Sequence, residues 1–247
     1  VQKTGKLSFP SLAAITASDC VIDGFKICNS AGRGLVVTGS RNVVRNCWMD
    51  FTYTSVLSVN GGGAPADCAD NLIEDCEISR GSVGVYAPKD EPIFGRPWDM
   101  ILATRNSLRT VFRRCKVHHC FAEGIVLDRD SVDGVIEFCE SYNNMHMCFY
   151  LNNAQRPTIR FCKGWSTGNT EMLRGGEWAS EPLVITEEVK KTDGKAVGQK
   201  VYGCVFVGGR YVVTLARVGT KQDTQLKGGY FGYNTLVSDM RAIPIMQ

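Results

Sequence analysis

Apolar and polar positions follow one another along this chain in a short unit that recurs from one end to the other. In the first half of the unit, an apolar residue is followed three positions later by a cysteine. Six segments fit this description: VRNC (44–47), IEDC (73–76), FRRC (112–115), IEFC (136–139), IRFC (159–162) and VYGC (201–204). The second half is a short apolar run, as in GLVV (34–37), SVLSV (55–59), GVYA (84–87), GIVL (124–127), CFYL (148–151) and VVTL (212–215). Self-similarity at a fixed spacing predicts a solenoid, in which each repeat stacks on the next.

The length of the repeat and its residue types favour strands over helices. The cysteine position of the unit falls at Phe25, Cys47, Cys76, Cys115, Cys139, Cys162, Cys204 and Gly229, the looser copies IDGF (22–25) and LKGG (226–229) included. The shortest spacings are about 22–25 residues, with Gly, Asn and Asp between the apolar runs, whereas helical solenoids need about 33 or more. We therefore predict an all-β protein, a right-handed parallel β-helix of about eight coils. It would form one domain over residues 1–247, with 1–20 as an initial strand and cap.

Charged residues provide a check on the register of the predicted strands. One series follows the first apolar position, at Arg45, Glu74, Arg113, Glu137 and Arg160, and another follows the cysteine, at Glu77, Lys116, Glu140 and Lys163. Both series alternate in sign from repeat to repeat. In a parallel, in-register stack these side chains lie above one another on the outside, where each opposite pair contributes about 0.2–1 kcal/mol. We therefore expect two ladders of ion pairs that hold the register.

Three longer segments interrupt the repeat at 61–71, 88–109 and 168–199. Long loops in compact folds often carry function, although such segments also serve to cover a fold. The second segment contains Phe94, Arg96 and Trp98, and an exposed indole suits stacking on a sugar ring. We therefore treat Trp98 and Arg96 as candidate substrate-binding residues.

Cysteine content and net charge limit the classes of function. The chain has 11 cysteines without a CxxC pair, and six of them share one repeat position. This arrangement predicts a buried ladder of reduced thiols. The net charge of +3 gives no basic footprint for nucleic acid, and no apolar run is long enough to span a membrane. Secretion suits a carbohydrate-active protein, whereas unpaired thiols also fit a cytoplasmic protein or a virion component.

Candidate chemistry gathers after the fourth predicted coil. Glu123 precedes GIVLDRDS, which contains Asp128, Arg129 and Asp130, and the neighbouring coils supply His146 and Tyr150 on one side and Tyr86 and Lys89 on the other. Strand alternation turns Tyr86, Val126 and Tyr150 outward on one sheet, so we expect an exposed patch of carboxylates, phenols and a guanidinium. Such a set suits an acidic polysaccharide. Arg129 would neutralise a uronate carboxylate, and Tyr150, His146 or Lys89 would transfer the proton. Asp128 and Asp130 equally suit a self-paired corner of the coil.

The candidate metal ligands lie in the same segment. Asp128 and Asp130, with nearby carbonyl groups, have the oxygen ligands that calcium prefers, so a calcium site is an open expectation. The three histidines, His118, His119 and His146, lack the spacing of a zinc site.

The segment HCFAEGIVLDRDSVDGVIEFCESYNN resembles right-handed β-helix repeats of carbohydrate-binding and sugar-hydrolase proteins, the pectate-lyase-like superfamily. GIVLDR with Ser131 and Val132 is similar to a coil of alginate epimerases, which carry an Asp-Pro-His-Asp motif on a nearby strand. Here Ala87-Pro88-Lys89-Asp90 stands in the comparable place, with the Pro and the second Asp matching. The resemblance implies a lyase, epimerase or hydrolase.

Two classes of function therefore stay open. The first is a carbohydrate-active protein that binds or acts on an acidic polysaccharide, with Tyr86 and Glu123 among its substrate-binding residues. The alternative is a non-catalytic structural or adhesive β-helix, such as a phage tail-fibre segment or a surface module. Polysaccharide is the expected partner, nucleic acid and membrane are not, and we expect a monomer or a homotrimer.

Overall fold

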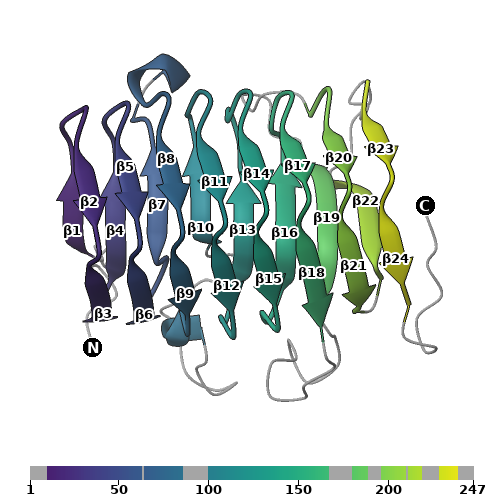
Figure 1. The fold of residues 1–247 in the computed structure, drawn as a ribbon, viewed down its shortest axis with the longest axis horizontal. Helices are drawn as coiled ribbons and strands as arrows, with labels where there is room; N and C mark the ends of the chain where they lie inside the picture. Colours follow the sequence, from purple (N-terminus) through teal and green to yellow (C-terminus); the bar gives the residue numbers. More distant parts are fainter. Residues whose placement is uncertain are drawn as a thin grey trace, which may run out of the picture.

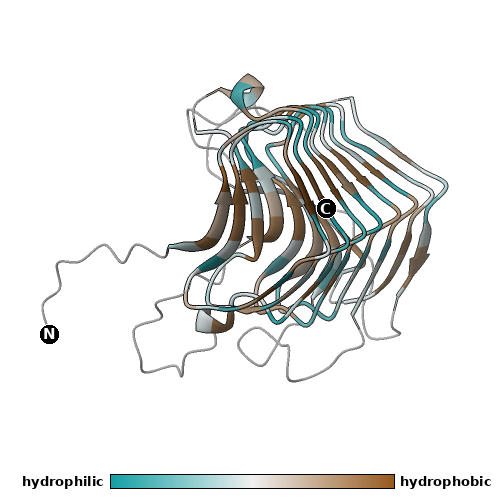
Figure 2. Cartoon of the chain, turned by 60° about the vertical axis from the view of Figure 1, so that its left-hand side comes forward, coloured by the Kyte–Doolittle hydropathy of each residue, from teal (hydrophilic) through white to brown (hydrophobic). Residues whose placement is uncertain are grey.

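The chain winds into a three-sided stack of coils (Figure 1). The computed structural model describes residues 10–62, 64–85, 100–166, 180–188, 196–209, 211–218 and 228–238. Over these residues three parallel sheets of eight strands each run along the stack, and every coil gives one strand to each sheet. Figure 2 shows the coils lying one behind another around a shared interior. The prediction of an all-β parallel β-helix with eight coils is confirmed.

We name the sheets A, B and C in the order in which a coil visits them. Sheet A contains β1 (Ser11–Ile15), β4 (Arg33–Val37), β7 (Leu57–Asn60), β10 (Met100–Arg105), β13 (Glu123–Leu127), β16 (Met147–Asn152), β19 (Glu181–Glu188) and β22 (Val213–Val218). Sheet B contains β2 (Val21–Asp23), β5 (Val43–Arg45), β8 (Leu72–Glu74), β11 (Val111–Arg113), β14 (Val135–Glu137), β17 (Thr158–Arg160), β20 (Lys200–Tyr202) and β23 (Tyr230–Gly232). Sheet C contains β3 (Lys26–Ser30), β6 (Trp48–Thr52), β9 (Glu77–Ser79), β12 (Lys116–His118), β15 (Glu140–Tyr142), β18 (Lys163–Ser166), β21 (Val205–Gly208) and β24 (Thr235–Val237).

Helix is almost absent from the part of the chain that the structure describes. It is limited to two short 3-10 turns, η1 (Pro65–Asp67) and η2 (Val83–Val85). Among these residues we find no helix with the length and apolar character needed to cross a membrane.

Equivalent residues of successive coils stack along the interior, and this stacking explains the repeat in the sequence. In sheet B the inward positions of neighbouring strands pair directly, as in Phe112 with Ile136 and Ile136 with Ile159, and all three are fully buried. Each residue therefore needs an apolar partner one coil away. Because the side-chain period of a strand is two, a slip of one residue would expose the whole series.

The cysteine ladder is confirmed as a column of buried thiols. All 11 cysteines are free, and the six repeat cysteines lie in the interior. The backbone N–H of Cys115 donates to Sγ of Cys139 at 3.4 Å, and that of Cys162 donates to Sγ of Cys204 at 3.5 Å. The prediction for the last coil is wrong, because the equivalent position is Asn234 rather than Gly229. The Asn234 Oδ1 accepts a hydrogen bond from the backbone N–H of Cys204 at 2.9 Å.

Both predicted ladders of alternating charge stand on the outside of sheets B and C. Glu137 Oε1 accepts from Arg113 Nε at 2.6 Å, and its Oε2 accepts from Arg160 Nε at 2.8 Å. On sheet C, Lys116 pairs in register with Glu77 and Glu140, and Lys163 Nζ lies 3.5 Å from Glu140 Oε1. The alternation predicted from sequence therefore holds the register of two neighbouring sheets.

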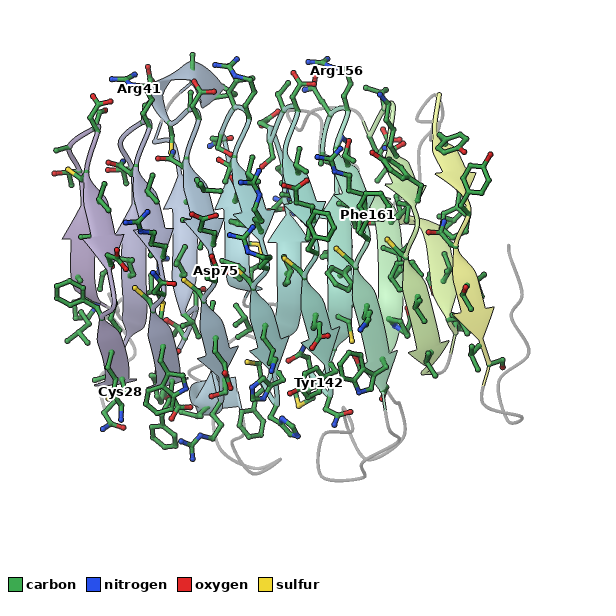
Figure 3. The ribbon with its side chains drawn as sticks, viewed as in Figure 1. Cys28, Arg41, Asp75, Tyr142, Arg156 and Phe161 are labelled. Carbon is green, nitrogen blue, oxygen red and sulfur yellow. The ribbon has the colours of Figure 1, made fainter. Side chains whose placement is uncertain are left out.

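A third charge ladder, which we did not predict, follows the corner between sheets A and B. Three bidentate pairs join residues one coil apart: Asp19 with Arg41, Asp70 with Arg109, and Asp133 with Arg156. All six residues have a φ between 50° and 62°, so they occupy one equivalent left-handed turn position. Arg41 and Arg156 mark this corner along the upper edge of Figure 3.

Two strands of sheet A lie where sequence reasoning placed insertions. GVYA was expected to be the strand of the coil after Cys76, but its described residues belong to η2. The strand that pairs with β7 and β13 is β10, which falls inside the supposed insertion 88–109. Likewise, β19 falls inside the supposed insertion 168–199 and pairs with β16 and β22. Each supposed insertion therefore contains a strand of the repeat, because MILATR and EPLVITEE differ from the apolar runs that define the second half of the unit.

Candidate functional site

The outer face of sheet A carries the chemistry that the sequence singled out. Alternation along β10, β13, β16 and β19 turns one residue in two away from the interior. The outward residues at mid-strand are Ala103, Val126, Tyr150 and Val184, which pack against one another as an apolar cluster separate from the core. These four side chains are at most 3% exposed. The expectation that Val126 and Tyr150 point outward holds, but the expectation that they form an exposed patch is wrong.

Two residues after each of these positions, and at the matching end of β7, the outward side chains are polar. We call Asn60, Arg105, Asp128, Asn152 and Thr186 the polar row; it follows the carboxyl ends of β7, β10, β13, β16 and β19. Asn60 pairs in register with Arg105, and Asn152 with Thr186. Successive members therefore lie one coil apart along the rod.

Asp128 is the centre of the polar row. Its carboxylate is 1% exposed and accepts from Arg105 Nε at 2.5 Å and from Asn152 Nδ2 at 2.9 Å. Arg129 Nε lies 4.0 Å from Asp128 Oδ1. A buried carboxylate is stable only when paired and hydrogen-bonded, so Asp128 holds the Arg105 and Asn152 side chains in place.

Tyr150 joins this network through Thr186. The Thr186 hydroxyl donates to Asn152 Oδ1 at 3.3 Å, so the Tyr150 hydroxyl, 2.8 Å from Thr186 Oγ1, acts as the donor to it. The network thus runs from the phenol through Thr186 and Asn152 to the Asp128 carboxylate. It ties Tyr150, Asp128 and Arg105 into one unit.

Glu123 and His146 stand at the opposite edge of sheet A. His146 Nδ1 lies 3.6 Å from Glu123 Oε1, and both side chains are largely buried, at 12% and 6% exposure. Glu123 begins β13 and Asp128 follows its end, so the two carboxylates are roughly 15 Å apart along the strand. The predicted single patch therefore divides into two groups: Asp128, Arg129 and Tyr150 at one edge, and Glu123 and His146 at the other.

The remaining candidates add less to the geometry. Asp130 has a φ of 58° and occupies the turn after β13, as expected for the corner interpretation of this segment. Tyr86, Lys89, Arg96 and Trp98 lie outside the described residues. The described residues contain no group of three or more side chains suited to hold a metal ion. Calcium therefore stays a prediction from the sequence.

Sequence reasoning missed three residues that organise the site. Asn152 and Thr186 each lie two positions after an outward residue of their strand, so extending the alternation by one step would have found Asn152. Arg105 was missed because β10 was assigned to an insertion. Once β10 is aligned with β13, Arg105 falls beside Asp128.

Comparison with known protein families agrees with this architecture. The family model for the right handed beta helix region matches residues 12–171. The chain belongs to the right-handed β-helix family. Searches of curated proteins and of solved structures gave no match. The family fits both carbohydrate-active and adhesive proteins, so it leaves both classes of function in place.

Proposed function

We propose that this β-helix protein binds an acidic polysaccharide at the edge of sheet A formed by the polar row. The observation that carries the proposal is the pair of guanidinium groups, Arg105 and Arg129, on either side of the buried Asp128 carboxylate. The Arg105 side chain is 40% exposed and that of Arg129 is 21% exposed, so both can reach a ligand. A guanidinium matches a carboxylate in geometry and charge, as a uronate ligand requires.

The position of Asp128 makes these arginines a prepared site. Arg105 is fixed by its hydrogen bond to Asp128, which is itself held by Asn152. Side chains that are already ordered lose less entropy when a ligand binds.

Elimination or epimerisation is the finer form of the proposal. Neutralising a uronate carboxylate acidifies the adjacent C–H, and the proton then needs an acceptor. Tyr150 belongs to the same network as the arginines, whereas the Glu123–His146 pair lies at the far edge. Because Tyr150 is 3% exposed, the geometry supports recognition more directly than turnover. We therefore place binding first and measure turnover separately.

The test compares two matched arginine substitutions by calorimetric titration with alginate, pectate and a glycosaminoglycan. Arg129→Ala should weaken binding about tenfold or more, as expected for the loss of one charge-assisted hydrogen bond. Arg45→Ala, on the outer face of sheet B three coils away from Asp128, removes the same side chain and should leave affinity unchanged. The proposal would be refuted if both variants lost the same affinity for the acidic polysaccharide. It would also be refuted if the wild-type protein bound a neutral dextran as tightly as an acidic polysaccharide. Ultraviolet absorbance of an unsaturated uronate product would establish elimination.

A further inference from the structure

The corner between sheets B and C carries exposed aromatic side chains where other coils have small or polar ones. Every coil makes this turn with a residue in the left-handed region: Gly24, Asn46, Asp75, Arg114, Phe138, Phe161, Gly203 and Tyr233. Gly, Asn and Asp tolerate this conformation, but a bulky residue there costs about 1 kcal/mol or more. Phe138, Phe161 and Tyr233 are also 52%, 48% and 90% exposed. Folding alone therefore favours neither their conformation nor their exposure.

Four rings follow one another along the rod, and Tyr233 stands at the equivalent turn of the last coil. We call these five residues the aromatic strip: Phe138, Phe161, Tyr202, Tyr230 and Tyr233. The ring centroids of Phe138 and Phe161 are 5.3 Å apart, those of Phe161 and Tyr202 5.7 Å, and those of Tyr202 and Tyr230 6.4 Å. Phe161 and Asp75 mark the line of this corner across the front of the molecule in Figure 3. Phe138, Phe161 and Tyr230 are about half exposed and Tyr233 is 90% exposed, so at roughly 100 Å² for a half-exposed ring these four offer on the order of 500 Å² of aromatic surface. A contiguous patch of this size usually marks an interaction site.

The geometry of the rings argues for a protein partner and against a sugar. Phe138 and Phe161 stack at an interplanar angle of 20°, so their facing sides cover each other and mainly edges point outward. Sugars pack against open ring faces. A second apolar protein surface, by contrast, can bury ring edges.

Charges beside the aromatic strip point to a second copy of this chain. The coil of Phe138 carries Glu137 and Glu140, one on each side of the strip; Glu140 is partly exposed, whereas Glu137 is buried against two arginines. The next coil, that of Phe161, carries Arg160 and Lys163 at the same positions. A negative coil thus lies directly beside a positive one, and this pattern is complementary to itself.

Of the parallel and antiparallel ways of packing two rods, only the antiparallel one uses that complementarity. If two rods packed in parallel, each coil would face the same coil of the other copy, and the exposed Lys163 would meet Arg160. If they packed antiparallel about an axis between the two coils, the partly exposed Glu140 would face Lys163 of the second copy, while Glu137, which is 3% exposed, stays paired with Arg113 and Arg160 of its own chain. The same axis places Phe138 against Phe161, and Tyr233 near Asp75, whose carboxylate can accept from the phenol. Like-charge contacts cost energy, so the antiparallel arrangement is favoured.

We propose that the aromatic strip is the interface of an antiparallel homodimer with its two-fold axis between the coils of Phe138 and Phe161. The strip and its charged flanks approach the roughly 800 Å² per partner of a standard interface. This assembly differs from the homotrimer or monomer expected from sequence. It is independent of the polar row, which lies on sheet A.

Sedimentation equilibrium of the full chain under reducing conditions, over a series of concentrations, tests the proposal. The wild-type chain should dimerise, and Phe138→Asn combined with Phe161→Asn should raise the dissociation constant at least tenfold. Asn suits the left-handed turn, so the variant should keep its melting temperature at dilutions where both proteins are monomeric. The proposal would be overturned if the wild-type chain were monomeric at all concentrations or formed a trimer. It would also be overturned if the two substitutions left the dissociation constant of the dimer unchanged.

A charge substitution separates the two packing directions. Lys163→Glu should weaken an antiparallel dimer, because Glu140 would then face a second carboxylate. In a parallel dimer the same change would relieve the contact of Lys163 with Arg160 and strengthen association, which would contradict our assignment. Combining Lys163→Glu with Glu140→Lys restores both the pair within the chain and the pair between copies. This double variant should recover the wild-type dissociation constant within a few-fold.

Discussion

Asp50 allows a sharp test of how much buried charge contributes to this fold. Its side chain, 3% exposed on the outer face of β6, accepts from Ser79 Oγ and Arg80 Nε, each at 2.9 Å, and also from Arg80 Nη2. Asp70 likewise accepts two hydrogen bonds from Arg109, at 2.6 and 2.7 Å, but its side chain is 42% exposed. Asp→Asn at the two positions therefore removes the same charge from two sites that differ mainly in burial.

The expected magnitudes follow from the surroundings of the two carboxylates. Breaking a buried ion pair costs about 3–5 kcal/mol, and the 56% exposure of Arg80 lowers this because its charge is rehydrated. We expect Asp50→Asn to reduce the free energy of unfolding by about 2–3 kcal/mol. For the exposed pair, Asp70→Asn should cost at most about 1 kcal/mol.

The effect of Asp50 should also depend on pH. Burial raises the pKa of Asp50, but hydrogen bonds and charge from Arg80, with Ser79, outweigh it and hold the pKa below the ordinary value. A carboxyl group whose pKa is lower in the folded protein than in the unfolded one binds fewer protons in the folded state. Its ionised form therefore stabilises the fold fully at pH values above the unfolded pKa of about 3.9. The stabilisation is lost as the pH falls through the folded pKa. The difference between wild type and Asp50→Asn should therefore be full at neutral pH and shrink in acid.

Urea unfolding followed by circular dichroism, at neutral pH and at several acid values, measures both effects. Each protein should be studied at a dilution where it is monomeric, so that association does not contribute. The reasoning is refuted if the two variants lose the same stability at neutral pH. It is also refuted if the loss from Asp50→Asn persists unchanged in acid.

Two further predictions concern close packing and the thiols. A Cβ added at Gly124 would lie 2.5 Å from both the Cys148 carbonyl oxygen and Ser141 Oγ, so Gly124→Ala should lower stability by about 1–3 kcal/mol in urea unfolding. Gly62→Ala meets no atom within 4 Å and should have no measurable effect; similar losses in both would contradict the packing argument. Burial raises the pKa of the Cys120 thiol to about 12 and shields all nine buried cysteines from solvent, so a thiol reagent should modify only the half-buried Cys20 and Cys28 before unfolding. Rapid reaction of more than two thiols in the native protein would contradict this prediction, because it would show that the buried cysteines are accessible to the reagent.

The architecture could be predicted because stacking imposes its rules on every coil. A position such as Cys139 needs a partner above and below, so the same residue type returns in Cys115 and Cys162 and becomes visible as a repeat. Charge alternation adds a second constraint, since Glu137 lies between two arginines in register. These are local rules, and a single sequence displays them directly.

Sheet A was harder to predict because its strands differ more from one another. The described part of GVYA forms η2, whereas MILATR, which lacks the glycine of GLVV and GIVL, forms β10. An apolar run of four to six residues fits a strand in many registers, and only the pairing with β13 selects the correct one. The burial of Tyr150 could not be inferred either, because alternation gives the direction of a side chain and says nothing of what covers it.

Departures from the repeat are the most informative positions in this solenoid. At positions that serve only to stack the coils, the residue changes from one coil to the next so that it can pair with its neighbours, as the alternating charges of sheets B and C do. The polar row does not alternate in charge, and Phe138 and Phe161 replace residues better suited to their backbone. The two departures lie on different sheets, so they can be perturbed separately. Arg129→Ala should leave association unchanged, and the paired Phe→Asn substitutions should leave polysaccharide affinity unchanged. A variant that altered both properties together would show that ligand binding and association share one surface.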